Sequence, residues 1–442
     1  MQINWGLDNY LFYQQRKEEV VSWSSQEVIN GHMLLVGKSG TGKTHRLRNI
    51  VKQLVAESER LNKKIRIHII DVHGDIDIDN ASTVKFSEST NYGFNPLLIN
   101  PDEDFGGVRK RIQSFVSALN KTSRQLGTKQ EACLRNILTD LYNANGFRET
   151  DPKTWKLDDG IQRKFPKKNP TLEDATKFAM YKLKGLFLGT DSRAVRALEN
   201  LNKKQLALNA KRKKMSVSNG FDDENAQDEI EKLSQEAIDL YVEYIGSIKT
   251  GLELDDLIKY DSKDVMKSVV ERLENLNAIG IFKTITPPFD EKNPIWRYVI
   301  KSLSMDEKKL FVYFRLEEIF YQSVQRGVQD DIVDIIILDE AHNFFTDDDD
   351  NIINTIAKEA RKFGLALICA SQSPTHFSDD FVSNVGTKII LGIDQMYWDG
   401  SVRKLKIDPK ILEFITPHKT MALQINNKGE LRAKFRQVLL KN

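Results

Sequence analysis

Residues 30–102 alternate between short apolar runs and one amphipathic stretch. The run HMLLVG ends in glycine and is followed by THRLRNIVKQLVAESERLN, which has the apolar spacing of a helix. The positions that share one face of this helix are Leu47, Ile50, Val51, Leu54 and Val55. IRIHIIDV then follows as an apolar run typical of a buried strand. Strand, helix and strand in this order imply a right-handed crossover, so we expect a parallel sheet.

Residues 103–264 have a different pattern, rich in Lys, Glu, Asn and Leu and poor in strand-like runs. KQEACLRNILTDLYNA predicts an amphipathic helix. The stretch from 194 to 245 predicts two long charged helices around a turn near Asn219–Gly220. We therefore expect several helices joined by polar loops.

Strand-like patterns return in residues 265–442, with helical text such as NIINTIAKEARKFG between some of them. The strand candidates are KKLFVYFRL, IVDIIILDE, LALICASQ, TKIILGI, KTMALQIN and ELRAKFRQV. The simplest architecture is one α/β core built from 30–102 and 265–442, with 103–264 as a helical insertion and 1–29 as a short N-terminal segment. Two separate domains are the alternative.

Composition limits the class of protein further. Hydrophobic residues make up 40% of the 442 residues and charged residues 29%, as in a soluble globular protein. No apolar run approaches the roughly 20 residues of a membrane span, and the N-terminus lacks the pattern of a signal peptide. The two cysteines, Cys133 and Cys369, are expected to be ordinary buried thiols. We expect a cytoplasmic protein without direct membrane anchoring.

The net charge of +2 means that any binding of nucleic acid would need a local arrangement of Lys and Arg. The basic runs at Lys211–Lys214 and Arg109–Arg111 could contact a phosphate backbone, but solvated helix faces explain them as well. The acidic run Asp347–Asp350 is expected to be a solvated loop.

The segment GKSGTGKT matches the full phosphate-binding loop pattern, and it lies after a predicted strand and before a predicted helix. Its glycines let backbone N–H groups turn toward phosphate oxygens, and the helix N-terminus adds partial positive charge. The predicted nucleotide contacts are Gly37, Lys38, Ser39, Gly40, Thr41, Gly42, Lys43 and Thr44. Lys43 would reach the β and γ phosphates of ATP, and Thr44 would bind Mg²⁺.

A second candidate element is IIILDEAH, an apolar run that ends in two carboxylates. Asp339 would emerge at the carboxyl end of the strand, where α/β sheets place their ligands, and would act on Mg²⁺ through water. Glu340 would orient or deprotonate the attacking water. Acidic pairs also end strands without a catalytic role, but the phosphate loop in the same chain favours the functional interpretation.

Three further positions follow or precede predicted strands. Gln372 ends LALICASQ and could sense the γ-phosphate if its strand lies next to that of Asp339. Arg361 could reach the γ-phosphate of a neighbouring subunit, or could be a solvated cation at a helix end. In IIDVHGDI, the carboxylates of Asp71 and Asp75 could support the water shell of Mg²⁺, whereas zinc is not expected at the lone His73.

Taken in order, MLLVGKSGTGKT, IIDVHGD, GFNPL, IIILDEAHNFF and EARKFGLALICASQSP resemble the HerA/FtsK superfamily of P-loop ATPases, and most closely its HerA-like branch. The resemblance covers both outer regions, and RKFGLALICASQSP after LDEAH is its most discriminating part. It implies an α/β, RecA-like P-loop ATPase core, a mainly parallel sheet flanked by helices, with a helical insertion.

The resemblance also implies a function. Members of that superfamily form hexameric rings that move double-stranded DNA through a central pore, often beside a nuclease. Here it implies ATP hydrolysis with Lys43, Glu340 and Gln372 in catalysis, and a trans-acting arginine at Arg361 or, instead, Arg403 or Arg326. The N-terminal β-barrel of HerA proteins is not expected in the 29 residues before the core, and ATPases of this shape often accompany effectors in antiphage defence.

Two other functions stay open at this point. One is a conjugation or secretion ATPase that works with a membrane partner. The other is a regulatory NTPase whose hydrolysis switches an effector complex without movement along DNA.

Overall fold

The structure, a computed structural model, describes residues 1–158, 160, 166–188, 192–217, 224–247, 258–348 and 351–440. The chain divides into two units. The core unit comprises residues 1–94, 117–123 and 283–442, and the helical unit comprises 95–116 and 124–282. The predicted domain boundaries remain a prediction.

The core unit is built on one eleven-stranded sheet of the described residues, with the strand order β2-β1-β11-β10-β9-β3-β8-β7-β4-β6-β5. Seven adjacent strands, from β9 to β5, pair in parallel, and the remaining strands pair antiparallel at one side. The strands are β1 (Gln2–Asp8), β2 (Val20–Ser24), β3 (Met33–Val36), β4 (Arg66–Asp71), β5 (Ser82–Lys85), β6 (Ile295–Val299), β7 (Asp334–Leu338), β8 (Leu365–Ser371), β9 (Thr387–Ile390), β10 (Thr420–Ile425) and β11 (Arg436–Leu439). The expected mainly parallel sheet is therefore confirmed.

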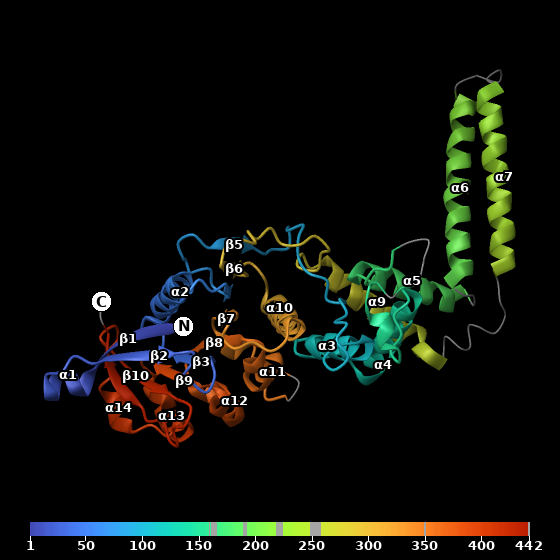
Figure 1. Cartoon of the computed structure of the whole chain (residues 1–442). Coiled ribbons are helices and arrows are strands. Elements are labelled where there is room, and N and C mark those ends of the chain that lie inside the picture. Colours follow the sequence, from blue (N-terminus) through green and yellow to red (C-terminus); the bar gives the residue numbers. More distant parts are fainter. Residues whose placement is uncertain are drawn as a thin grey trace. The chain divides into compact units, whose positions relative to one another are not determined.

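Helices lie on both faces of the parallel strands, with α2 on one side and α11 and α12 on the other (Figure 1). The helices of the core unit are α1 (Asn9–Gln15), α2 (Lys43–Arg60), α10 (Met305–Arg326), α11 (Ile352–Glu359), α12 (Asp379–Asn384), α13 (Trp398–Leu405) and α14 (Pro409–Glu413). Short 3-10 turns η2 (Ala341–Asn343), η3 (Ala360–Phe363), η4 (Pro374–His376) and η5 (Gln395–Tyr397) follow or precede the strands.

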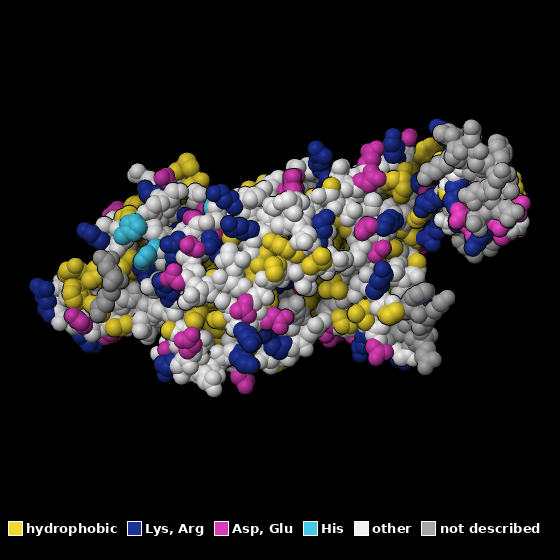
Figure 2. Space-filling view, turned by 90° about the horizontal axis from the view of Figure 1, so that it is seen from above, with side chains coloured by type: hydrophobic (Ala, Val, Ile, Leu, Met, Phe, Trp, Pro, Cys, Tyr) yellow, Lys and Arg dark blue, Asp and Glu magenta, His cyan; other side chains and the backbone are white. Residues whose placement is uncertain are grey.

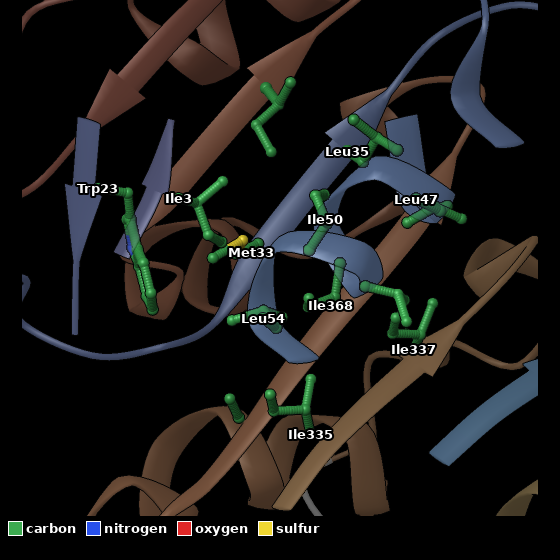
Figure 3. Packing of buried hydrophobic residues seen from close by; sticks show 14 of the residues in the cluster. Ile3, Trp23, Met33, Leu35, Leu47, Ile50, Leu54, Ile335, Ile337 and Ile368 are labelled. Atoms are coloured by element: carbon green, nitrogen blue, oxygen red, sulfur yellow. The ribbon is translucent and has the colours of Figure 1, made fainter. Parts of the chain in front are cut away.

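The apolar face predicted for α2 forms the centre of the core. Leu47, Ile50 and Leu54 point at the sheet, where they meet Ile337 and Ile368 from β7 and β8 (Figure 3). All of these side chains are at most 1% exposed. Burial of each stabilises the fold by about 1.5–3 kcal/mol relative to exposure, and it fixes the start of α2 at the end of β3.

The prediction of a strand at KKLFVYFRL was wrong, because these residues lie inside helix α10. α10 begins with a capping box in which Ser304 and Glu307 bond each other's backbone N–H groups. Consecutive residues from Leu310 to Phe314 are all buried, so the apolar run hides the period of the helix. The sequence SMDE just before the run was the available signal for a helix start.

The residues at both ends of the chain extend the sheet. β1 pairs with β11 and β2, and its alternate residues Ile3 and Trp5 are buried. β11 begins only at Arg436, later than the run ELRAKFRQV predicts. Strands more than 400 residues apart in sequence are thus direct neighbours near one edge of the sheet.

The helical unit contains α4 (Thr128–Ala144), α5 (Leu172–Leu188), α6 (Ser192–Val217), α7 (Glu224–Ser247), α9 (Lys263–Ala278), most of α3 (Val108–Asn120) and the turn η1 (Pro152–Trp155). The two long charged helices are confirmed as α6 and α7, which pack along each other. Lys204 pairs with Glu236 and Lys211 with Glu229 across them. The predicted turn at Asn219–Gly220, the side chain of Lys214, and residues 349–350 of the acidic run lie outside the described residues.

Charged side chains of both signs are interspersed on the face seen in Figure 2. The thiols of Cys133 and Cys369 are buried and free, as predicted. Among the described residues, no helix is both long and apolar enough to span a membrane.

Candidate active site

The phosphate loop leaves the sheet between two neighbouring strands and is held by both. The N–H group of Gly37 donates to the Ser371 carbonyl at the end of β8, at 3.0 Å. The N–H group of Lys38 donates to the Gly392 carbonyl just after β9, also at 3.0 Å. The loop is therefore anchored at its start, while Lys38, Ser39 and Gly40 are exposed.

Two loop glycines have left-handed backbone angles, with φ of 80° at Gly40 and 91° at Gly42. A side chain at either position would strain the backbone, which explains the glycine pattern physically. Helix α2 begins at Lys43, so the N–H groups of its first turn have no acceptor within the helix. These N–H groups and the helix dipole suit a phosphate ligand.

Lys43, Asp339 and Glu340 converge although some 300 residues separate them in sequence. Lys43 Nζ donates to the Gly37 carbonyl at 2.7 Å and lies 4.0 Å from Glu340 Oε1. Asp339 and Glu340 directly follow β7 and are 6% and 8% exposed. Two nearly buried carboxylates therefore follow β7, and that of Glu340 faces the lysine of the phosphate loop.

Burial raises the pKa of Asp339 to about 6, and the neighbouring carboxylates of Glu340 and Asp75 act in the same direction. Such a group gains from a nearby cation, because a positive ion restores the charged form of the carboxylate. A divalent metal beside Asp339 would supply that charge.

Gln372 directly follows Ser371, the residue whose carbonyl holds Gly37. Its strand β8 lies between β3 and β7, so Gln372 follows the strand that separates the phosphate loop from the two carboxylates. The side chain is exposed. The condition expected from the sequence, that the strand of Gln372 lies next to that of Asp339, is confirmed, and the role of Gln372 as a γ-phosphate sensor remains a prediction.

The loop after β4 contains two acidic side chains in different surroundings. Asp71 is fully buried and accepts hydrogen bonds from the N–H groups of Gly74 and Ile76. It also forms an ion pair with Arg297 of β6, at 2.8 Å. Asp71 therefore shapes the loop, while Asp75 Oδ2 lies 3.3 Å from Thr44 Oγ1.

Mg²⁺ prefers oxygen ligands such as carboxylates and hydroxyls. Carboxylate oxygens of Asp71, Asp75 and Asp339 lie within 4.8 Å of one another. Because Asp71 is already occupied by Arg297 and backbone N–H groups, the oxygens left to support a metal and its water are those of Thr44, Asp75 and Asp339. This oxygen set fits Mg²⁺, which would supply charge neutralisation next to the phosphates of a bound nucleotide.

The three candidate arginines lie in different places. Arg361 belongs to η3, which precedes β8, so it lies at the amino-terminal ends of the parallel strands, opposite the end that carries the phosphate loop. Arg326 lies at the same end of the strands and pairs with Asp334 at the start of β7. Arg403, on α13, bonds the backbone of its own helix through Asp399. Arg361 is exposed, and it cannot serve the site of its own chain.

Three histidines of the site were not predicted. His418 Nε2 lies 2.9 Å from the Gly40 carbonyl, and its ring packs against Gly42. His342 and His376 lie beside Glu340 and Ser371. Only His342 had a sequence signal, its place in LDEAH, because the other two reach the site through tertiary structure alone.

The sequence model of the helicase HerA central domain matches residues 14–294. This chain belongs to the HerA central-domain family. The match covers the phosphate loop and the helical unit and ends before Asp339. The resemblance predicted from the sequence is thereby confirmed.

Two curated relatives fit this assignment. A probable helicase of Methanocaldococcus jannaschii is 28% identical over 179 residues, which are 36% of this chain and 33% of that protein. The DNA double-strand break repair helicase HerA of Pyrococcus furiosus is 41% identical over 63 residues, 13% of this chain and 11% of that protein. The chain thus matches a third or less of the length of these relatives.

Two solved structures share the fold of this HerA-family chain. VirB4 of Thermoanaerobacter pseudethanolicus superposes with a TM-score of 0.62 at 12% identity, covering 100% of this chain and 96% of that one. The bacterial conjugative coupling protein TrwB gives a TM-score of 0.50 at 9% identity, covering 99% and 94%. The likeness confirms the RecA-like P-loop ATPase fold.

Proposed function

We propose that this HerA-family chain is an ATP- and Mg²⁺-dependent motor that moves along double-stranded DNA as a hexamer. The observation that supports this most strongly is the convergence at three adjacent strand ends. The phosphate loop follows β3, Gln372 follows β8, and Asp339 and Glu340 follow β7. The name of the Pyrococcus furiosus relative, a DNA double-strand break repair helicase, supports DNA as the substrate.

In the proposed reaction, residues 37–44 cradle the phosphates of ATP, with Lys43 on the β and γ phosphates. Thr44 and Asp339 hold Mg²⁺, and Glu340 orients the attacking water. Gln372 senses the γ-phosphate. Mg²⁺ neutralises charge on the phosphates, which is the main catalytic need in phosphoryl transfer.

Arg361 is proposed to complete the site of the next subunit. It is exposed, and it lies at the amino-terminal ends of the parallel strands, away from the phosphate loop of its own chain. We propose a nuclease or other effector protein as the partner, in the antiphage setting that the resemblance implies.

The site is tested by Lys43→Ala and Glu340→Gln, which should each lower DNA-stimulated ATP hydrolysis by about 10²–10⁴-fold. Glu340→Gln should still bind ATP, since it keeps the phosphate loop. Glu359→Gln, at an exposed carboxylate on α11, is the matched control and should retain full activity. Full activity in Lys43→Ala or Glu340→Gln would contradict the assignment of these residues to the active site.

The ring is tested by mixing two inactive variants, Arg361→Ala and Glu340→Gln. If Arg361 acts in trans, mixed rings contain interfaces with an intact Glu340 on one side and an intact Arg361 on the other, so mixing should restore activity. The same mixture with Arg326→Ala or Arg403→Ala shows which arginine is involved. The mass of the purified protein should be measured with and without ATP and duplex DNA. The mass of a monomer under all of these conditions would contradict the proposed ring.

The remaining functions give different outcomes. DNA-stimulated turnover without movement along DNA in single-molecule assays would indicate a regulatory switch. Recovery of the chain with membranes would indicate a membrane-partnered conjugation or secretion ATPase.

A further inference from the structure

Glu340 is in contact with a small cluster of polar side chains formed by His342, Ser371 and His376. His342 Nδ1 is 3.3 Å from Glu340 Oε2 and 3.4 Å from Ser371 Oγ. Ser371 Oγ is also 3.3 Å from His376 Nδ1 and 3.4 Å from the Ser373 carbonyl. The two imidazole rings lie 4.9 Å apart.

These contacts cannot all be hydrogen bonds at the same time. Burial lowers the pKa of His342 and of His376, so both rings are neutral at pH 7. The Nδ1 atom of a neutral histidine either donates or accepts. His342 Nδ1 can therefore donate to the Glu340 carboxylate or accept from Ser371, but not both.

Ser371 has one proton and several acceptors within reach. If its hydroxyl donates to His376 Nδ1, then His342 is free to carry its proton on Nδ1 and to donate it to Glu340. If the hydroxyl donates to His342 Nδ1, that bond to Glu340 is lost. The fully buried position of Ser371 leaves these protein groups as its partners.

The backbone of Glu340 is also constrained. Its φ of 46° and ψ of 43° are left-handed values, which are uncommon for a residue other than glycine and are found most often where function requires them. One carboxylate oxygen faces Lys43 at 4.0 Å, and the other faces His342. The orientation of this carboxylate is therefore decided by its two neighbours.

We propose that His342, Ser371 and His376 are positioning residues that switch Glu340 between a held and a released orientation. This proposal rests on the proposed role of Glu340 in hydrolysis. In the held state His342 donates to Glu340 and keeps one oxygen away from water. In the released state the proton of neutral His342 lies on Nε2, exchanged through solvent at this partly exposed ring; Ser371 donates to Nδ1, and both oxygens of Glu340 are available to orient the water.

Two substitutions at neighbouring atoms should have opposite effects. Ser371→Ala removes the hydroxyl and leaves Glu340 as the partner of His342 Nδ1, so basal kcat should fall about 5- to 10-fold, the value of one hydrogen bond. His376→Ala removes a competing acceptor, so Ser371 donates to His342 more often and basal kcat should rise several-fold. The KM for ATP should stay constant in both variants, since neither side chain bonds the phosphate loop.

His376→Asn is the conservative variant, because its Oδ1 occupies the place of Nδ1, and it should return kcat to the wild-type value. Ser383→Ala, at an exposed serine of α12, is the control and should behave as wild type. Equal losses in Ser371→Ala and His376→Ala would overturn the switch and indicate a structural role only. By contrast, absence of Lys43-dependent hydrolysis in the wild type would overturn the proposed function itself.

Discussion

The core unit buries charged residues beside its candidate site, whereas the charged pairs that join α6 and α7 of the helical unit are exposed. In the core, Asp71 and Arg297 form an ion pair whose side chains are 0% and 8% exposed, and Asp339 and Glu340 are nearly buried. Between α6 and α7 of the helical unit, Lys204 and Glu236 pair with 41% and 38% of their side chains exposed. The ion pair beside the site is buried and the pair between α6 and α7 is solvated. Burying a charge costs free energy unless the charge is paired and hydrogen-bonded, as Asp71 is.

Arg297→Ala should cause the largest loss of stability among the charge variants, about 3–5 kcal/mol, because it leaves a buried carboxylate without its cation. The loss should appear in the hydrogen-exchange protection of the core strands. Arg297→Lys keeps the charge but not the planar guanidinium group, so its stability should lie between those of Arg297→Ala and the wild type. Unchanged protection in Arg297→Ala would mean that the backbone N–H groups that donate to Asp71 stabilise its buried charge without Arg297.

Nucleotide should stabilise the core unit alone. In Glu340→Gln with Mg²⁺, ATP at 100 times its Kd should add about 2.7 kcal/mol to the stability of the core, as expected for a ligand that binds only the folded state. Hydrogen exchange should slow in β3, α2 and β8 but not in α6 and α7. If ATP slowed hydrogen exchange equally in both units, nucleotide binding would not be confined to the core unit.

The buried acid Asp339 predicts a pH dependence for the core. Its pKa in the folded state, about 6, is above the ordinary value of 3.8. Folding therefore favours the protonated form of Asp339. The free energy of unfolding keeps this stabilisation in full below pH 3.8 and loses it as pH rises through 6, by roughly 2–3 kcal/mol in total. Urea denaturation followed by tryptophan fluorescence reports on the core, where Trp5 and Trp23 are buried.

The control for this effect is Asp339→Asn, which cannot ionise. The difference between wild type and variant should shrink toward low pH, since the acid is neutral there in both the folded and the unfolded state. A difference that stays constant with pH would contradict the raised pKa.

The smallest effect is expected at the surface of the helical unit. Lys204→Ala should change stability by less than about 1 kcal/mol, as is usual for exposed ion pairs, and less again at high salt. Thermal unfolding at low and high salt measures this. A loss as large as that of Arg297→Ala would mean that the pair joining α6 and α7 is more than a surface contact.

Much of the fold could be predicted from pattern. Parallel strands at β3, β4, β7 and β8, and the helices α2, α6 and α7, follow from apolar spacing that repeats locally. The exception was α10, where burial on all sides removed the helical period from the pattern. The strands β1, β2, β5 and β6 were also missed, although β6 is mostly apolar and β1 alternates apolar and polar residues. Each is only four to seven residues long and gains its sheet partners from segments distant in sequence.

The sequence by itself determined the chemistry of this protein, since the order of residues in GKSGTGKT and LDEAH specifies a phosphate loop and a carboxylate pair. Only the tertiary structure decided which groups meet. It placed β8 between β3 and β7, bonded Asp71 to Arg297 rather than leaving it for a metal, and brought His376 and His418 to the site. The reason is that local spacing fixes an element and the face it buries, whereas contacts across a sheet depend on strand order, which no local pattern encodes.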